Sequence, residues 1–182
     1  EIRRSRRDSH QFALLFFDFD RFKVINDSLG HGVGDALLIS IGERLIEQTR
    51  DTDTVARFGG DEFVVLLCDI ESVHDARLAC DRLLAALSKP HLIEGNEVVS
   101  TASIGVVCSD PSYRTANEII RDADAAMYAA KLNGKAQYRM FDAQLHSDAV
   151  ERLQMEQEMR RADPEREFRV LYQPIVSLNT GA

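Results

Sequence analysis

The stretch Arg57–Phe63, RFGGDEF, places two glycines directly before two acidic residues, Asp61 and Glu62. Apolar sequence typical of β-strands precedes and follows it. Two glycines between two strand-like segments predict a tight hairpin, because two-residue turns require positive φ angles. Since Gly59 and Gly60 lack side chains, such a turn lets a bulky ligand approach the backbone closely. We therefore expect a binding site with acidic groups at the hairpin tip.

A second pair of acids, Asp18 and Asp20, follows the continuous apolar run Phe12–Phe17, which is typical of a buried strand. Residues two apart on a strand share a face, so both carboxylates are expected on one side of the strand end. Together with the hairpin acids they provide oxygen ligands for one or two hard divalent cations. Mg²⁺ usually binds one or two protein carboxylates and takes its other ligands from water and phosphate oxygens. This pattern favours chemistry on a nucleoside triphosphate.

Each of these features also has a purely structural explanation. Acidic residues at a hairpin tip increase solubility, and for an isolated GGDE segment that explanation is the more common one. Lys131 and Lys135, in KLNGK, lie where they could bind phosphate. Lysines near a helix C-terminus also interact favourably with the helix dipole. Taken one at a time, these residues leave both explanations open.

A series of predicted strands and helices carries these residues. Hydrophobic periodicity predicts strands at 12–17, 54–58, 62–68, 97–109 and 137–141. It predicts helices at 73–87 and 116–133 and two within 22–48, separated by the glycine-rich 30–34. The apolar face of the helix after this break is predicted to contain Leu37, Leu38, Ile41, Leu45 and Ile46. A hairpin combined with helical crossovers predicts an α+β fold, an α/β sandwich in which helices flank a central mixed sheet.

The amino-acid composition and net charge of the chain argue against some classes of protein function. The chain has 182 residues and a formal net charge of −8, which argues against nucleic-acid binding through a basic surface. No apolar run approaches the roughly 18 residues of a membrane span, so we expect no membrane contact from this segment. Cys68, Cys80 and Cys108 lack metal-site spacing and are expected to be reduced core thiols. These features suit the cytoplasm, although other sequence in a longer protein could tether it to a membrane.

From about Asp142 the sequence changes in character. Residues 142–167 are highly charged and helix-favouring, with Pro164 as a stop, and predict a helical linker. Residues 168–182 begin a new apolar strand. We therefore expect one main domain over residues 1–141, a linker over 142–167 and the start of a second domain over 168–182.

The sequence also resembles a known family. RFGGDEF matches the signature of GGDEF domains, the diguanylate cyclases that condense two GTP molecules into cyclic di-GMP and release pyrophosphate. The resemblance extends through DFDRFKVINDSLGHGVGDALL and DADAAMYAAKLNGK, over roughly Phe12 to Phe141 and in the family's order. The terminal LYQPIVSLNTG is similar to the opening strand of an EAL domain, the cyclic di-GMP phosphodiesterase module that often follows GGDEF. The resemblance implies a nucleotidyl-cyclase-like fold in a GGDEF–EAL protein, truncated at the start of its EAL domain.

The resemblance implies a metal and catalytic role for four residues. Asp18, the backbone carbonyl of Phe19, Asp61 and Glu62 would hold Mg²⁺, and Mn²⁺ would also suit these ligands. Asp61 would in addition act as the general base toward the ribose 3′-hydroxyl, while Glu62 completes the metal site.

The resemblance likewise implies the nucleotide contacts. Asn26 and Asp35 would recognise the guanine edge through hydrogen bonds. The β- and γ-phosphates would be bound by backbone amides and lysine side chains, at Phe22, Lys23, Lys131 and Lys135. The turn glycines, Gly59 and Gly60, would admit the nucleotide against the backbone.

Two further expectations follow from the resemblance. Because one domain binds one GTP, catalysis would require an antiparallel homodimer with two-fold symmetry. Arg50 and Asp53 form an R-x-x-D pattern five residues before Gly59, the spacing of the family's product-inhibition site for cyclic di-GMP.

The chain departs from the family at its beginning. The family segment of the kind D-x-L-T-x-L-x-N-R is absent before the first strand, and the sequence starts with EIRRSRRDSHQ. Activity of this polypeptide is therefore less certain than activity of an intact protein. Two alternatives also remain: a regulatory domain that binds GTP without turnover and controls an EAL phosphodiesterase, and a purely structural dimerisation module.

Overall fold

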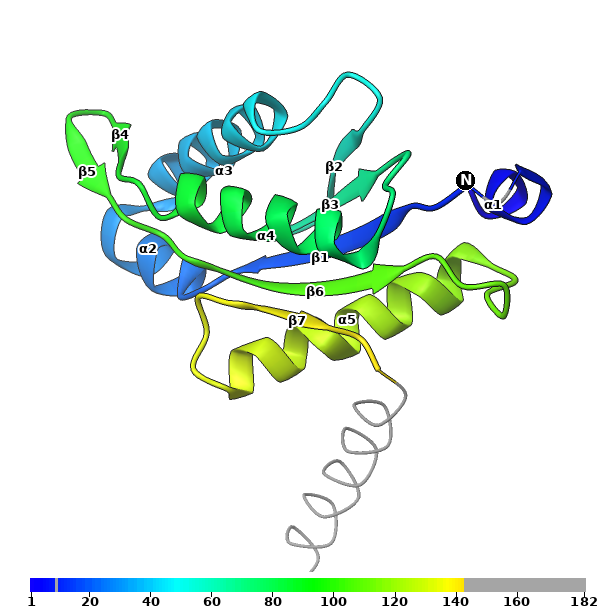
Figure 1. The fold of residues 1–182 in the computed structure, drawn as a ribbon. Helices are drawn as coiled ribbons and strands as arrows, with labels where there is room; N and C mark the ends of the chain where they lie inside the picture. Colours follow the sequence, from blue (N-terminus) through cyan, green and yellow to red (C-terminus); the bar gives the residue numbers. More distant parts are fainter. Residues whose placement is uncertain (9, 143–182) are drawn as a thin grey trace, which may run out of the picture. The chain divides into compact units, whose positions relative to one another are not determined.

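The computed structural model describes residues 1–8 and 10–142. These lie within the first of the two units into which the chain divides, Glu1–Ala149. The predicted linker beyond Asp142 and the predicted second-domain start at 168–182 fall outside the described residues. The helices are α1 (Ile2–Asp8), α2 (Phe22–Leu29), α3 (His31–Glu47), α4 (Val73–Leu87) and α5 (Ala116–Leu132) (Figure 1). The strands are β1 (Ala13–Phe19), β2 (Thr54–Gly59), β3 (Glu62–Leu67), β4 (His91–Ile93), β5 (Asn96–Val98), β6 (Ala102–Cys108) and β7 (Tyr138–Met140).

Five strands form the central sheet in the order β2-β3-β1-β6-β7. β1 lies in the middle and is antiparallel to both β3 and β6, whereas β7 pairs with β6 in parallel. Helices cover both faces of this mixed sheet, with α3 and α4 on one side and α5 on the other (Figure 1). The predicted α+β fold with a helix-flanked mixed sheet is confirmed.

Alternation along β1 directs its side chains into two separate cores. Phe17 is buried in the larger cluster, with α3 and α4. Phe16 is buried in the smaller cluster, with α5. Asp18 lies two residues after Phe16 and therefore on the same face of the sheet, the face covered by α5. On the neighbouring strand β3, the residue paired with Asp18 is Glu62. The central sheet therefore decides which face of the molecule carries the acids.

The predicted hairpin is present, but its turn lies one residue further on. Gly59 ends β2 and pairs with Glu62, so the turn residues are Gly60 and Asp61. Of the two glycines, Gly60 alone has a positive φ, 51°. The register also shifts between Arg57 and Gly59, which leaves Phe58 as the extra residue of a β-bulge.

The prediction of one strand over 97–109 is wrong. Only β6 belongs to the central sheet, because the preceding residues form β5 and pair with β4 in a separate two-stranded hairpin. The turn of that hairpin, Glu94 and Gly95, has φ angles of 49° and 82°. Hydrophobic periodicity does not reveal such a turn. Ile46 also departs from its prediction, since it is 63% exposed rather than buried on the apolar face of α3.

Two predictions from composition can be compared with the described residues. Cys68, Cys80 and Cys108 are all free thiols, and the first two are buried, which agrees with reduced core cysteines. Among the helices of the described part of the chain, none is long and apolar enough to cross a lipid bilayer.

Candidate active site

The centre of the site is a pair of carboxylates on neighbouring strands. Asp18, near the end of β1, lies directly opposite Glu62, at the start of β3. Lys131, in the last turn of α5, places its Nζ 2.5 Å from Asp18 Oδ2. The two side chains of this ion pair are 29% and 14% exposed, so it is largely withdrawn from solvent. Strand pairing and helix packing thus bring together three residues that the sequence analysis had singled out.

Burial raises the pKa of both carboxyl groups. For Asp18, burial outweighs the neighbouring Lys131 ammonium, which lowers the pKa, and the charge of Asp61 raises it further. For Glu62, burial acts most strongly and the charges of Asp124, Asp18 and Asp61 add to it. Among the described residues, four carboxyl groups, those of Asp18, Asp61, Glu62 and Asp124, thus surround the single ammonium of Lys131, and a bound cation would stabilise their charged forms.

Asp124 belongs to this acidic group, although the sequence analysis did not include it. It lies on α5 seven residues before Lys131, and this spacing places both residues on one face of the helix, two turns apart. Burial raises the pKa of Asp124, whereas Lys131 lowers it. The available signal was this helical spacing of an acid and a lysine within DAAMYAAK.

Asp20, predicted as a second available carboxylate at the strand end, has a structural role instead. It is 7% exposed. Its oxygens accept hydrogen bonds from the hydroxyls of Thr101, at 2.7 Å, and Ser103, at 2.9 Å, and from the backbone N–H of Ala136, at 3.1 Å. The last of these bonds fastens the loop that carries Lys135 to the end of β1. Lys135 itself is exposed and has a φ of 64°.

The N-terminus of α2 supplies backbone donors next to the end of β1. Arg21, the residue before the helix, has a left-handed conformation with φ 61° and ψ 20°, and its side chain makes no capping hydrogen bond. The N–H groups of Phe22 and Lys23 lie in the first turn, where helix geometry offers them no partner. An uncapped helix N-terminus of this kind attracts phosphate groups.

The residues predicted to recognise guanine lie on α2 and α3. Asn26 Oδ1 is buried and has no hydrogen-bond partner among the described residues. Asp35, on α3, is exposed. A Cβ atom on Gly34 would lie 1.8 Å from Asn26 Oδ1, so Gly34 leaves the space that the Asn26 amide occupies. The sequence analysis interpreted this glycine only as part of a helix break.

The carboxylates of the site suit a hard divalent cation that takes most of its ligands from water and from the bound nucleotide. No group of three or more His, Cys, Asp or Glu side chains in residues 1–8 and 10–142 lies close enough to enclose a metal ion. Mg²⁺ needs only one or two protein carboxylates, and Asp18 and Glu62 supply two on adjacent strands. Phe19, the last residue of β1, and Asp61, in the turn, are their neighbours in sequence. Water and phosphate oxygens would complete the coordination.

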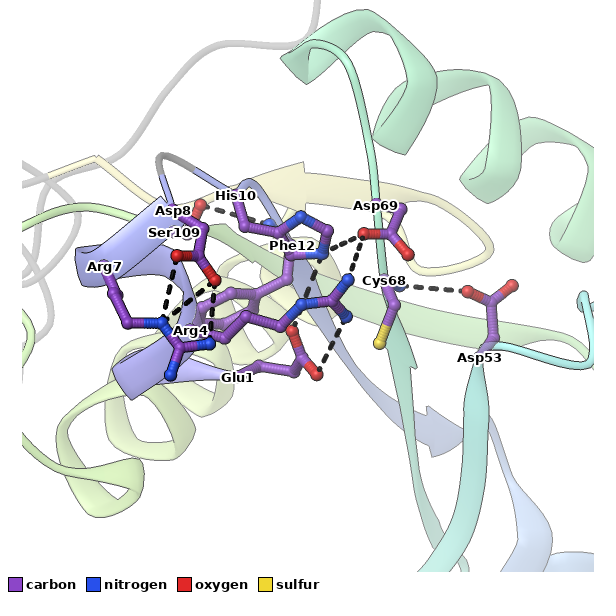
Figure 2. Close-up of polar contacts among 10 residues, drawn as sticks. All are labelled: Glu1, Arg4, Arg7, Asp8, His10, Phe12, Asp53, Cys68, Asp69 and Ser109. Carbon is purple, nitrogen blue, oxygen red and sulfur yellow. Dashed lines mark hydrogen bonds and ion pairs between the residues drawn. The ribbon is translucent and has the colours of Figure 1, made fainter.

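Arg50 and Asp53 lie before β2, away from the carboxylate pair. Asp53 Oδ1 accepts the backbone N–H of Cys68 at 3.0 Å (Figure 2), and Oδ2 accepts that of Arg50 at 2.9 Å. Both residues line a pocket of about 110 Å³ that also contains Asp75 and Arg82 of α4. This volume is below the roughly 300–1,000 Å³ of small-molecule sites, so the pocket admits only part of a ligand.

Comparison with known proteins gives these features a context. Residues 1–137 match the family described as "Diguanylate cyclase, GGDEF domain". The chain is 39% identical over 180 residues, 99% of its length, to the bifunctional diguanylate cyclase/cyclic di-GMP phosphodiesterase MucR of Pseudomonas aeruginosa. It is 40% identical over 169 residues, 93% of its length, to the cyclic di-GMP phosphodiesterase NbdA of the same species. It spans only 26% of MucR and 22% of NbdA.

A solved structure supports the same relationship. The GGDEF domain of TpbB from P. aeruginosa has a TM-score of 0.75 and 39% identity to this chain, covering 78% of this chain and 88% of that one. TpbB is named a diguanylate cyclase.

Proposed function

This chain belongs to the diguanylate cyclase GGDEF-domain family, and from that premise we propose that it condenses two GTP molecules into cyclic di-GMP. In each of two equivalent steps, the 3′-oxygen of one GTP attacks the α-phosphorus of the other. The bond to pyrophosphate breaks, and Asp61 accepts the proton of the 3′-hydroxyl. The observation that carries this proposal is the pairing of Asp18 with Glu62 beside Lys131, at the base of an open glycine turn.

The other residues of the site bind and orient the nucleotide. Asp18, Glu62, Asp61 and the Phe19 carbonyl would hold Mg²⁺, which neutralises charge that develops on the phosphates. The buried acceptor of Asn26, with Asp35, receives hydrogen bonds from guanine N–H groups. The amides of Phe22 and Lys23 and the side chains of Lys131 and Lys135 bind phosphate oxygens.

Condensation of two GTP molecules requires two sites that face each other. We therefore propose an antiparallel homodimer with two-fold symmetry, acting in the cytoplasm where its substrate is found. Activity per milligram should then rise with protein concentration until dimerisation is complete, and a constant value across dilution would contradict the dimer.

Arg50 and Asp53 are proposed to bind cyclic di-GMP as a product inhibitor. The supporting observation is that both line one pocket with a second arginine, Arg82. A guanidinium pairs with phosphate or guanine, and the Asp53 carboxylate retains acceptor capacity beyond its two backbone hydrogen bonds.

Substitution of the proposed base tests the function directly. Asp61→Asn removes the proton acceptor and is expected to lower the rate of cyclic di-GMP formation roughly 10²- to 10⁴-fold. Chromatography of products from GTP and Mg²⁺ measures this rate. Asp81→Asn, at an exposed position of α4, is the matched control and should retain full activity. Equal rates for both variants would reject the assignment of Asp61.

A second function is favoured by one comparison, the match to NbdA, which is named a phosphodiesterase. In this alternative the domain binds GTP without turnover and regulates a downstream EAL domain. Residues 142–167 would be the linker between the two domains, and residues 168–182 would be the first part of the EAL domain. A longer protein containing that domain would then hydrolyse cyclic di-GMP faster when GTP is added and synthesise none. Synthesis from GTP would favour the cyclase instead.

A further inference from the structure

Arg57 folds back over the hairpin turn that carries the proposed catalytic acid. Its Nε and Nη2 atoms both donate to the backbone carbonyl of Gly60, at 2.9 and 2.8 Å. The two residues lie on either side of the bulge at Phe58. The side chain thus spans the point at which the strand register shifts.

This contact acts on the geometry of Asp61 through the peptide bond. The carbonyl of Gly60 and the N–H and Cα of Asp61 belong to one planar peptide unit. A guanidinium that holds the carbonyl with two donors therefore restricts the rotation of the whole unit. The direction in which Asp61 leaves the turn is restricted with it.

The two glycines of the turn have no side chains packed over them, although the neighbouring Phe58 ring contacts Phe16, with ring centroids 5.3 Å apart. Apart from chain neighbours, no heavy atom of the described residues lies within 4 Å of the position that a Cβ would take on Gly59 or Gly60. Glycine has the greatest backbone freedom of any residue. A tip that is open enough to admit a nucleotide is for the same reason poorly fixed by packing.

We propose that Arg57 is a positioning residue, which fixes the Gly60–Asp61 peptide and thereby aims the Asp61 carboxylate. The expected effect of Arg57 on the reaction rate rests on the proposed cyclase function. Its expected effect on the mobility of the turn does not. A competing role is direct binding of GTP phosphates by the exposed guanidinium. The two roles differ in the kinetic constant that they change.

Kinetics of the full 182-residue chain separate these roles. Arg57→Met removes both donors and is expected to lower kcat roughly ten- to a hundredfold, with KM for GTP within about threefold of its original value. Arg57→Lys keeps the charge but not the planar fork, so it should restore little activity. Arg3→Met, at an exposed arginine of α1, is the control and should match the unsubstituted chain. A raised KM with unchanged kcat, or full activity of Arg57→Lys, would overturn the proposal.

Amide relaxation by NMR tests the clamp without any turnover. In the ligand-free chain, Arg57→Met should reduce the order parameters of the Gly60 and Asp61 amides from about 0.85 to below about 0.6. The melting temperature should shift by less than about 3 °C, because the lost bonds are exposed. Unchanged order parameters would overturn the proposal. Absence of cyclic di-GMP from the unsubstituted chain would instead reject the proposed function, while the NMR result would still decide the role of Arg57.

Discussion

At the scale of single residues, the side-chain oxygen of Asn26 is a buried acceptor on a residue that we propose recognises guanine. Asn26 Oδ1 has no hydrogen-bond partner among the described residues, and leaving a buried acceptor unpaired is unfavourable. The amide can occupy this position only because residue 34 is a glycine. If Asn26 contacts guanine as proposed, a guanine N–H would supply the missing hydrogen bond, and this gain would favour binding.

Gly34→Ala tests this arrangement. The new methyl group would lie 1.8 Å from Asn26 Oδ1 and displace the amide. Affinity for a non-hydrolysable GTP analogue, measured by calorimetry, is expected to fall roughly five- to a hundredfold. Gly32→Ala lies on the same helix with nothing within 4 Å of its Cβ and serves as the control. Equal loss of affinity in both variants would show that helix composition, rather than the Asn26 position, is responsible.

At the scale of elements, the packing of α5 on β6 sets the position of Lys131 and Asp124. A Cβ on Gly105, in the middle of β6, would lie 1.8 Å from the carbonyl oxygen of Ala123 and 2.3 Å from the amide nitrogen of Met127. The backbones of the helix and the strand therefore approach closely. This approach holds the C-terminal turn of α5 near Asp18.

Gly105→Ala is expected to destabilise the fold by roughly 1–3 kcal/mol or more, because the contacting atoms are backbone and cannot rotate away. Urea unfolding monitored by circular dichroism measures the change. Gly42→Ala is the control, since its Cβ would have its nearest contact at 3.5 Å, with Phe63. In helix α3 that change should be neutral or stabilising by up to about 1 kcal/mol. A Gly105→Ala variant as stable as the original would contradict the close packing.

At the scale of the whole molecule, a buried histidine joins the β4–β5 hairpin to α3. His91 is 1% exposed. Its Nδ1 lies 2.8 Å from Ser40 Oγ, and its Nε2 lies 3.0 Å from Nη1 of Arg44. Because a guanidinium can only donate, Nε2 accepts and the ring proton is on Nδ1. Burial, together with the charge of Arg44, lowers the pKa of His91 to about 4.

This lowered pKa predicts a loss of stability in acid. In the folded state His91 stays neutral, whereas in the unfolded chain it binds a proton near the ordinary histidine pKa of 6.5. The stability that buried His91 contributes is therefore fully present above pH 6.5. It should decline by up to roughly 3 kcal/mol as the pH falls from 6.5 to about 4. The raised pKa values of Asp18 and Glu62 act in the opposite direction over this range.

Comparison with His91→Gln isolates the contribution of the histidine. The difference in free energy of unfolding between the original chain and this variant should shrink from pH 7.5 to pH 4.5. His74→Gln, at an exposed position, should leave the pH dependence unchanged. Parallel curves for the original and His91→Gln would contradict the assignment.

Local patterns in the chain were sufficient for much of this architecture. Apolar periodicity predicted the main helices and the strands of the hairpin, and the two glycines predicted the turn to within one residue. These features depend on near neighbours, which a sequence displays directly. The β4–β5 hairpin was missed because each of its strands has only 3 residues, which is too short to show an apolar alternation.

The sequence by itself determined which acids, lysines and glycines are available and in what order the elements follow. Only the tertiary structure decided which of them meet. Asp18 and Asp20 are two positions apart, yet the first faces Glu62 while the second turns toward Ser103 and Ala136, 83 and 116 residues away. The environment of a carboxylate depends on the strands and loops that pack against it. Long-range pairing, rather than the adjacent residues in the sequence, determines which strands and loops these are.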